Sequence, residues 1–217
     1  MTDWRVISEE CAQPLDTRHV KNPAPGKYGQ YIEGWHAIDE ANRIFGFGGW
    51  SYSVDTLVKT NQGTAEKADR DGRPYVQHEV GYAATVTVTV DEVTRQDVGH
   101  GAGDHKREGD AHEGAIKEAV TDALKRALRT FGYRFGLALY DKTKANVIDG
   151  VEADRQATAK QAYEDLFVQL QETDDMALDD FGKAHKEAVL SLRGTDYFDK
   201  IKADVEARKA SRQEDAA

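Results

Sequence analysis

The chain has 217 residues, which is enough for one domain of ordinary size and a smaller appendage. It carries 29 Lys and Arg residues against 39 Asp and Glu residues, a net charge of −10, which argues against a simple polybasic nucleic-acid binder. Its single cysteine, Cys11, excludes an internal disulfide and a multi-cysteine zinc site. No apolar run approaches the length of a membrane span, and the first ten residues lack the pattern of a signal peptide, so we expect a cytoplasmic protein.

The acidity is spread along the chain and is denser in its last third. Residues 1–150 hold 19 basic and 23 acidic residues, and residues 151–217 hold 10 basic and 16 acidic residues. Any nucleic-acid role therefore depends on a local patch, and the best candidate is residues 125–134, which contain four cations and no acid. A change of character near residue 150 predicts two parts, a core at 1–150 and an acidic helical region at 151–217.

The first part of the chain predicts a strand–helix unit. Trp4, Val6 and Ile7 lie close together and suggest a short edge strand. Residues 27–33 also predict a strand. Residues 35–45 place apolar side chains at helical spacing and end before a glycine, so they predict a helix.

Three further strands follow this unit. Residues 50–59 alternate in part, and the run TVTVTV makes residues 75–90 the strongest strand signal in the chain. The polar residues 60–73 predict a mobile hairpin tip, and residues 95–101 predict a returning strand. The expected fold class is therefore α+β, an antiparallel β-meander that leads into a helix, preceded by a strand–helix unit and followed by a helical tail.

A Gly-rich, charged loop is predicted at residues 102–109. The loop and its flanks hold histidines and acids that allow a metal-site interpretation: His100, Asp104, His105, Asp110, His112 and Glu113. Their spacings match no known metal motif, so a metal-dependent nuclease is the less favoured alternative. The chain also lacks the pattern GxxxxGK[ST], so we expect no nucleotide hydrolysis.

Residues 110–133 form the clearest helical pattern, with apolar residues at steps of one, three and four. Asp110 and Glu113 predict a capping box at its start, and Gly132 predicts a stop with positive φ. Small side chains let another backbone come close, so we expect a line of four alanines to pack against the sheet: Ala115, Ala119, Ala123 and Ala127.

The polar side of this helix has two interpretations. Lys125, Arg126 and Arg129 occupy an arc of about 100° near its C-terminal end. They fit a solvated face whose charges suit the helix dipole, with Asp122 and Arg126 as an i,i+4 pair. They also fit a comb of phosphate-binding cations that Arg134 extends beyond the helix.

The tail predicts three short amphipathic helices, at residues 157–171, 176–192 and 197–210. The pattern leaves open whether the tail folds alone or docks on the core.

Three stretches in order carry a family resemblance. KEAVTDALKRALRTFG (117–132) is similar to the signature helix of the Rad52 family of single-strand annealing and recombination mediator proteins. YIEGWHAIDEANRIFGFGGWSYSV (31–54) resembles the strand–helix–strand unit of that family, and DVGHG (97–101) resembles the strand end before the signature helix. The resemblance covers residues 18–141 and suggests a prokaryotic or phage-type member.

The resemblance implies a function for residues 1–150. This function is ATP-independent binding of single-stranded DNA and annealing of complementary strands, in homologous recombination and double-strand-break repair, with no cofactor and no catalytic residue. The expected DNA contacts are Arg18, Tyr31, Lys106, Arg107, Lys125, Arg126, Arg129 and Arg134, among which Tyr31 is expected as an aromatic residue suited to contact bases or sugars. Arg18 is the nearest counterpart of an upstream family arginine, with Lys21 and Lys27 as alternatives. Lys106 and Arg107 correspond to a second, outer DNA contact.

The resemblance also implies partners. It predicts a ring-like homo-oligomer in the cytoplasm of a bacterial or phage-infected cell, and a meander with an exposed edge gives such pairing a physical basis. The acidic tail is the candidate surface for a recombinase or a single-strand-binding protein. A partner-binding module that acts through this tail is the remaining alternative function.

Overall fold

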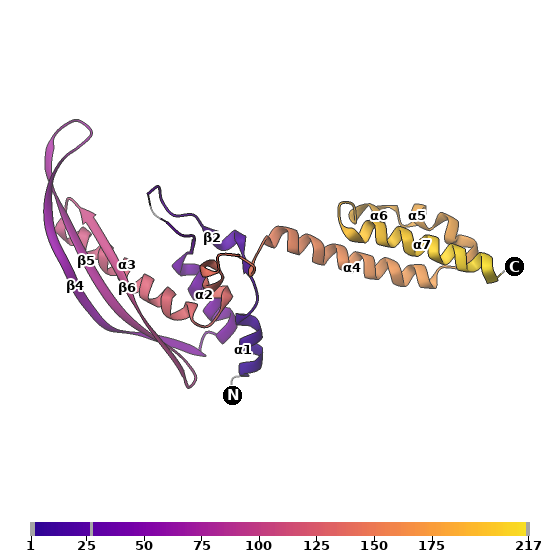
Figure 1. Cartoon of the computed structure of the whole chain (residues 1–217), viewed down its shortest axis with the longest axis horizontal. Coiled ribbons are helices and arrows are strands. Elements are labelled where there is room, and N and C mark those ends of the chain that lie inside the picture. The colour runs from indigo at the N-terminus through magenta and orange to yellow at the C-terminus, as the bar shows by residue number, and fades with distance from the viewer. Residues whose placement is uncertain (1–2, 27, 216–217) are drawn as a thin grey trace. The chain divides into compact units, whose positions relative to one another are not determined.

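The computed structural model describes residues 3–26 and 28–215 (Figure 1). The chain divides into two compact units, Met1–Ile148 (unit 1) and Asp149–Ala217 (unit 2), and each has its own hydrophobic core. None of the described helices combines the length and the apolar character that a membrane-spanning helix needs.

Unit 1 is built on a three-stranded antiparallel sheet in the order β4-β5-β6. β4 spans Trp50–Ala68, β5 spans Pro74–Val90 and β6 spans Val93–His105. Val90 of β5 lies opposite Trp50 of β4 and opposite Val93 of β6. The predicted α+β class and its antiparallel meander are confirmed.

Two strands of the meander, β4 and β6, are longer than predicted, and both extensions lie in polar stretches of the sequence. Residues 61–68, predicted as part of a mobile tip, continue β4 and pair with residues 74–81, and the turn is confined to residues 69–73. Residues 102–105, predicted as a loop, belong to β6. Side chains at this end of β4 are mostly exposed, so backbone pairing rather than burial holds the strand, and a hydrophobic pattern does not mark it.

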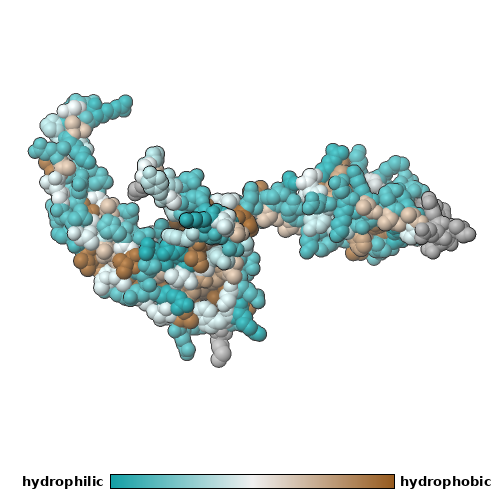
Figure 2. All heavy atoms as spheres, viewed as in Figure 1, coloured by the Kyte–Doolittle hydropathy of each residue, from teal (hydrophilic) through white to brown (hydrophobic). Residues whose placement is uncertain are grey.

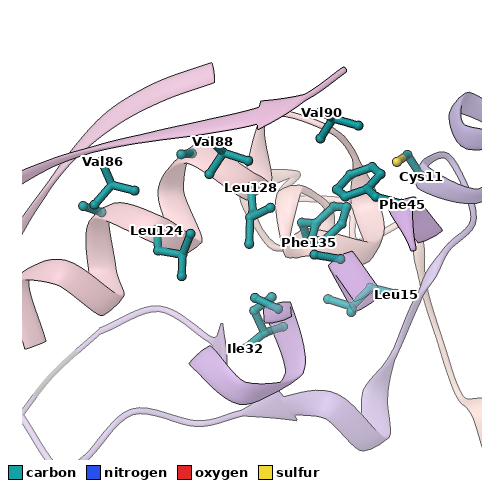
Figure 3. Packing of buried hydrophobic residues seen from close by; sticks show 14 of the residues in the cluster. Cys11, Leu15, Ile32, Phe45, Val86, Val88, Val90, Leu124, Leu128 and Phe135 are labelled. Carbon is teal, nitrogen blue, oxygen red and sulfur yellow. The ribbon is translucent and has the colours of Figure 1, made fainter. Parts of the chain in front are cut away.

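β5 shows the alternation that a half-buried strand requires. Val86, Val88 and Val90 are buried, whereas the threonines between them are half-exposed on the opposite face. The buried valines point toward α3 (Glu108–Arg129), where Leu124 and Leu128 meet them (Figure 3). The strand with the strongest sequence signal, β5, is therefore the strand whose buried side chains pack against α3 in the core.

α3 packs over β5 and β6 through small residues on both sides. The predicted alanine line is its buried side, which confirms that prediction. Beneath it lie Gly99, Gly101 and Gly103 of β6, and a Cβ atom at Gly101 would overlap the carbonyl oxygen of Ala115 and the amide nitrogen of Ala119. Helix and strand thus meet backbone to backbone, which only glycine on the strand permits.

Both predicted ends of this helix are wrong. Arg107 occupies the N-cap, and its Nε donates a hydrogen bond of 2.7 Å to Asp110, so Asp110 and Glu113 form no capping box. Gly132 lies beyond the end of the helix in an extended conformation, at φ 162°. It is needed for space, because a Cβ atom there would overlap the carbonyl oxygen of Cys11.

The N-terminal segment is a helix, not the predicted edge strand. α1 spans Trp4–Cys11, and the Asp3 side chain caps it by accepting a hydrogen bond of 3.0 Å from the backbone N–H of Arg5. Ile7 and Cys11, four residues apart, form its buried face. Burial raises the pKa of the Cys11 thiol to about 11.

α2 (Gly34–Phe45) matches the predicted helix, and short elements join it to the sheet. These are β1 (Leu15–Asp16), η1 (Thr17–His19), β2 (Val20–Lys21), β3 (Tyr31–Ile32), η2 (Tyr133–Phe135), η3 (Leu137–Tyr140) and β7 (Val147–Ile148). β2 pairs with β3 antiparallel, and β1 pairs with β7 in parallel. The strand predicted at residues 27–33 is thus reduced to β3, and Lys27 lies outside the described residues.

The core of unit 1 joins the end of α3 to α2. Phe45 of α2 stacks on Phe135 of η2, with ring centroids 5.6 Å apart, and Leu128 and Leu15 lie beside them (Figure 3). The segment that follows α3 is therefore anchored, and η3 is held next to the last turns of the helix.

Unit 2 is helical throughout its described length. It contains α4 (Gly150–Glu172), η4 (Asp175–Asp180), α5 (Phe181–Ala184), α6 (Lys186–Ser191) and α7 (Asp196–Asp215). The three predicted helices correspond to α4, to the η4–α5–α6 segment and to α7, but the middle one is broken into short pieces. α4 also begins earlier than predicted, because the Asp149 side chain accepts hydrogen bonds from the backbone N–H groups of Val151 and Glu152.

Replacing Gly101 by alanine should lower the free energy of unfolding of unit 1 by about 3 kcal/mol, because the added methyl group forces α3 off the sheet. Urea unfolding followed by tryptophan fluorescence measures this, since Trp4, Trp35 and Trp50 all lie in unit 1. Gly63→Ala in β4 is the control, because nothing lies within 4 Å of a Cβ atom there. Equal losses in the two variants would contradict the backbone-to-backbone contact.

Candidate nucleic-acid interface

Three cations of α3 lie along a hollowed face of unit 1. Lys125, Arg126 and Arg129 are half-buried in the last two turns of the helix, so they are not the freely solvated side chains that one interpretation of the sequence required. Together with residues of β3 and η3 they line a hollow of about 90 Å³. Each cation has a partner outside the helix, and these partners fix where its charge lies.

Asp97 on β6 is shared by two of these cations. Arg126 Nε donates a hydrogen bond of 3.0 Å to Asp97 Oδ1, and Arg129 Nη2 lies 3.8 Å from Oδ2. The hydrogen bond with Asp97 raises the pKa of Arg126 above its ordinary value. Residues 125–134 contain no acid, but the folded chain brings Asp97 of β6 next to them. Arg126 therefore pairs with Asp97 rather than with the predicted Asp122.

Two tyrosines flank the cations. Lys125 Nζ lies 3.5 Å from the carbonyl oxygen of Ile32 and 5.5 Å from the centroid of the Tyr31 ring. Arg129 donates a hydrogen bond to the Tyr140 hydroxyl, and its guanidinium carbon lies 4.3 Å from the centroid of that ring. Tyr140 is 67% exposed, so the ring that holds Arg129 remains open to a ligand. Tyr140 was not predicted as a site residue, because a single aromatic residue after the helix belongs to no periodic pattern.

The hollow continues along α3 on both sides of Lys125. A wider hollow of about 780 Å³ is lined by Tyr28, Tyr31, Tyr140 and Lys144, among others. A third, of about 440 Å³, lies toward the N-terminal half of the helix. Because Lys125 lines all three, they form one groove, which we name the α3 groove. Hydrophilic side chains cover most of the face of unit 1 seen in Figure 2.

Two acids of α3 line the α3 groove but bond to the sheet. Asp122 accepts a hydrogen bond of 3.3 Å from the backbone N–H of His100, and Glu118 accepts one of 2.9 Å from that of Ala102. These carboxylates occupy donors on the outer edge of β6. That edge is therefore closed by α3, whereas β4 pairs with β5 alone in the described sheet.

Arg18 lies on η1, where Asp16 holds it. Its Nε donates a hydrogen bond of 2.6 Å to Asp16 Oδ2, and its backbone N–H donates one of 2.8 Å to Oδ1. Burial acts to raise the pKa of Asp16, but the hydrogen bonds from Arg18 outweigh it and lower the pKa. Arg18 is not among the residues that line the α3 groove, whereas the alternative Lys21 lies opposite Tyr31 in the β2–β3 pair. The other alternative, Lys27, lies outside the described residues.

Arg134 lies on η2, near a stacked pair of histidines. The rings of His19 and His36 are parallel, with centroids 4.0 Å apart, and His36 is 3% exposed. Burial lowers the pKa of His36, and the nearby His19 and Arg134 act in the same direction. Among the described residues, His36 Nε2 and Arg134 Nε are buried without a hydrogen-bond partner.

Lys106 and Arg107 lie at the opposite end of α3. The rise of an α-helix places residue 107 about 27 Å from residue 125 along the axis. Lys106 Nζ lies 4.0 Å from the centroid of the Tyr75 ring, and Arg107 pairs with Asp110. The structure therefore separates these two predicted contacts from the α3 groove.

The histidines of the metal alternative have other partners. His112 Nδ1 lies 2.8 Å from the Tyr82 hydroxyl, and His105 Nδ1 lies 3.1 Å from Asp110 Oδ2. Within residues 3–26 and 28–215, no three or more His, Cys, Asp or Glu side chains are grouped as a metal site.

The comparisons with known proteins bear on the whole of this face. Residues 4–158 match the family model described as Rad52/22 family double-strand break repair protein. The chain belongs to the Rad52/22 family. The match covers every predicted DNA contact of unit 1 and ends within α4.

Curated relatives of the Rad52/22 family are similar over the same part of the chain. The DNA repair and recombination protein RAD52 of Eremothecium gossypii is 46% identical over 125 residues, which is 56% of this chain and 26% of the relative. RAD52 of Saccharomyces cerevisiae is 43% identical over 126 residues, 57% of this chain and 25% of the relative. The rad22 protein of Schizosaccharomyces pombe is 36% identical over 144 residues, 64% of this chain and 29% of the relative. The chain thus spans about a quarter of the length of these relatives.

The stability of unit 1 should fall as the pH drops from 7 to 5. The pKa of His36 is lowered from 6.5 in the folded protein, so the unfolded chain binds the proton more readily, and the stability that neutral His36 provides is lost as the pH falls through the folded pKa. The variant His36→Phe keeps a ring against His19 but does not titrate, so its stability should depend less on pH. Urea unfolding at several pH values measures this, with His100→Gln, an exposed histidine, as the control. A pH dependence in His36→Phe equal to that of the wild type would contradict the assignment.

Proposed function

We propose that unit 1 binds single-stranded DNA through its sugar–phosphate backbone and anneals complementary strands without ATP. The observation that carries the proposal is the α3 groove, in which Lys125, Arg126 and Arg129 lie side by side with two tyrosines. Cations neutralise phosphates, and aromatic rings stack on bases of any sequence. The biological setting that we propose is homologous recombination and double-strand-break repair. The family model is described as a double-strand break repair protein, and the relatives are named DNA repair and recombination proteins.

The geometry supports reversible binding. Arg126 and Arg129 already share Asp97, so an incoming phosphate competes with a carboxylate rather than filling an empty site. The cation–π contact at Tyr140 keeps Arg129 directed into the groove while the strand exchanges. A strand held by its phosphates leaves the Watson–Crick edges of its bases free to pair.

We propose that the protein acts without catalysis. Annealing exchanges base-pairing partners and breaks no covalent bond, so it requires neither a nucleophile nor an activated water. Lys125, Arg126 and Arg129 are suited to hold phosphates, and the tyrosines beside them are suited to stack. No cofactor enters this scheme.

Self-association is also part of the proposal. The face of β4 that continues the α3 side of the sheet carries Tyr52, Val54 and Leu57, which lie opposite the buried Val88, Val86 and Ala84 of β5. These three side chains are 41–49% exposed, because α3 covers β5 and β6. An open strand edge beside an apolar stripe favours contact with a second copy, and repeated contacts of this kind would close a ring with a continuous outer groove.

Unit 2 has a separate role in this proposal. Residues 151–217 hold 10 basic and 16 acidic residues, so they repel phosphate rather than attract it. We propose that annealing resides in unit 1 and that unit 2 binds a partner protein, such as a recombinase or a single-strand-binding protein. The relatives named above are fungal, so the comparisons do not support a prokaryotic or phage-type member, and that origin, with a cytoplasmic location, stays a prediction.

The direct test of this function is annealing of two complementary oligonucleotides in a buffer with a metal chelator and without ATP. The protein should accelerate duplex formation over the uncatalysed rate, and light scattering on the same sample should report a species much larger than the 24.1 kDa chain. Cleavage of the oligonucleotides on addition of a divalent metal would instead favour the nuclease alternative.

Removing the three cations should weaken binding of single strands equally for every sequence, because phosphate contacts carry no sequence information. In the triple variant Lys125→Gln, Arg126→Gln, Arg129→Gln, the slope of log affinity against log salt should shrink by about 2, at roughly 0.7 per contact. A labelled oligonucleotide titrated at several salt concentrations measures this. The control carries the same loss of charge in unit 2: Lys160→Gln, Lys186→Gln and Lys200→Gln. An unchanged slope in a folded α3 variant would mean that these cations do not touch DNA.

Replacing Asp97 by asparagine should tighten binding of single strands. The change removes the carboxylate that competes with phosphate for Arg126 and Arg129, so the salt slope should steepen by up to about 0.7 for each cation released. Asp71→Asn on the hairpin turn is the matched control, because it removes the same charge far from these residues. Weaker binding by Asp97→Asn at an unchanged slope would show that Asp97 orients the arginines more than it competes.

A further inference from the structure

Unit 2 carries an apolar hollow of its own, of about 360 Å³, between α7 and the η4–α5 segment. Figure 1 shows α5, α6 and α7 side by side in the chain's C-terminal part. Phe181 and Ile201 form its buried floor, and Val189 and Val205 are half-buried at its sides. A concave apolar surface of this volume is typical of a ligand site. We name it the unit 2 groove.

The rim of the unit 2 groove carries three lysines, Lys183 on α5 and Lys202 and Lys209 on α7. Lys202 forms no ion pair with any residue that the structure describes, and its Nζ lies 3.9 Å from the centroid of the Phe198 ring. Lys183 pairs with Asp180 at 2.8 Å, and both side chains are exposed. Exposed pairs contribute little, so Lys183 can exchange Asp180 for the carboxylate of a ligand.

The acids of the rim are already matched. Asp179 and Glu206 line the groove, and Lys209 Nζ lies 3.8 Å and 3.0 Å from their carboxylates. Lys202 and Lys183 therefore remain to meet a ligand. Charge complementarity favours an acidic ligand, and the floor favours one with a large apolar group.

The two remaining lysines and the floor set the pattern of the ligand. Lys183 on α5 and Lys202 on α7 line the same groove as Phe181 and Ile201, which form its floor. A peptide with acidic residues on either side of a pair of apolar residues presents carboxylates to the two lysines and an apolar group to the floor.

We propose that the unit 2 groove binds a short acidic peptide segment of a partner protein, with a large apolar side chain between the acids. The inference rests on the proposal that unit 2 contacts a partner, and it specifies the chemistry of that contact. A nucleic acid fits less well, because the floor of the groove is apolar and favours a buried aliphatic or aromatic side chain over a sugar–phosphate backbone.

The test uses the full chain and a fluorescein-labelled hexapeptide, EDLFDE, with fluorescence anisotropy as the readout. The peptide should bind the wild type, and Lys202→Glu should weaken binding by about tenfold or more, because it places a like charge beside the ligand. Lys200→Glu is the matched control, since Lys200 lies on the same helix but faces the Tyr163 ring of α4, 4.6 Å away. Its affinity should equal that of the wild type.

Two further probes separate the alternatives. KKLFKK, with the acids replaced by lysines, and EDSSDE, without the apolar pair, should both bind at least tenfold more weakly than EDLFDE. Equal binding of EDLFDE by Lys202→Glu and the wild type, or equal binding of KKLFKK, would overturn the proposal. If a single-stranded oligonucleotide displaces EDLFDE from the α3 triple variant, the groove binds nucleic acid. If EDLFDE binding is lost as the protein concentration and the particle size rise, the groove binds a second copy of the chain. Each outcome overturns the proposal.

The same samples keep this proposal distinct from the proposed function of unit 1. Lys202→Glu should anneal oligonucleotides at the wild-type rate, whereas the α3 triple variant should lose annealing and still bind EDLFDE. A wild-type protein that anneals oligonucleotides but does not bind EDLFDE would therefore contradict the unit 2 groove proposal alone.

Discussion

The close approach of the α3 backbone to the β6 backbone is the contact on which unit 1 depends. Alanines on the helix and glycines on the strand leave no side-chain layer between the two elements, so the helix has one register on the sheet. Ala123 lies over Gly99, and Asp97 is two residues away from Gly99 on the same face of β6. Arg126 lies one turn beyond Ala123, directly where Asp97 can meet it. The packing register therefore also sets the ion pairs of the α3 groove.

The α3 groove shows how a protein with a net charge of −10 can present a cationic surface. It contains few cations, but neighbouring groups fix their positions. Asp97 pairs with two of them, Tyr140 orients one, and a backbone carbonyl contacts Lys125. A side chain that is already ordered loses less conformational entropy when a phosphate arrives. The shared carboxylate limits the affinity at the same time. Both effects suit a protein that must hold a strand and then release it as a duplex.

The elements that the sequence predicted well are those with a strong period. α2, β5 and α3 follow from periods of 3.6 and 2 residues, and the alanine line predicted which face of α3 packs on the sheet. α1 was predicted as a strand because three neighbouring apolar residues hid the i,i+4 spacing of its buried face. The far half of β4 was missed because its side chains are exposed and show no hydrophobic period.

The site residues divide in the same way. The cations of α3 could be predicted from the sequence because they lie on one helix and on one arc of its surface. The role of Asp97 could not be predicted, because it depends on how β6 and α3 are aligned in space. Asp97 and Arg126, which the hydrogen bond joins, are 29 residues apart in sequence. Tyr140 depends on how η2 and η3 fold back onto the helix end, which the stacking of Phe45 on Phe135 determines. Tertiary register of this kind leaves no local pattern in a single sequence.

The function proposed for unit 1 requires that the protein hold the phosphates of a single strand and leave the base edges free. Dimethyl sulfate tests it most directly, because it methylates the Watson–Crick nitrogens N1 of adenine and N3 of cytosine when they are unpaired. A single-stranded oligonucleotide saturated with the protein should react at these nitrogens as fast as the free oligonucleotide does. Uniform protection of these nitrogens in the bound strand would mean that the protein contacts the base edges, and would contradict binding through the phosphates.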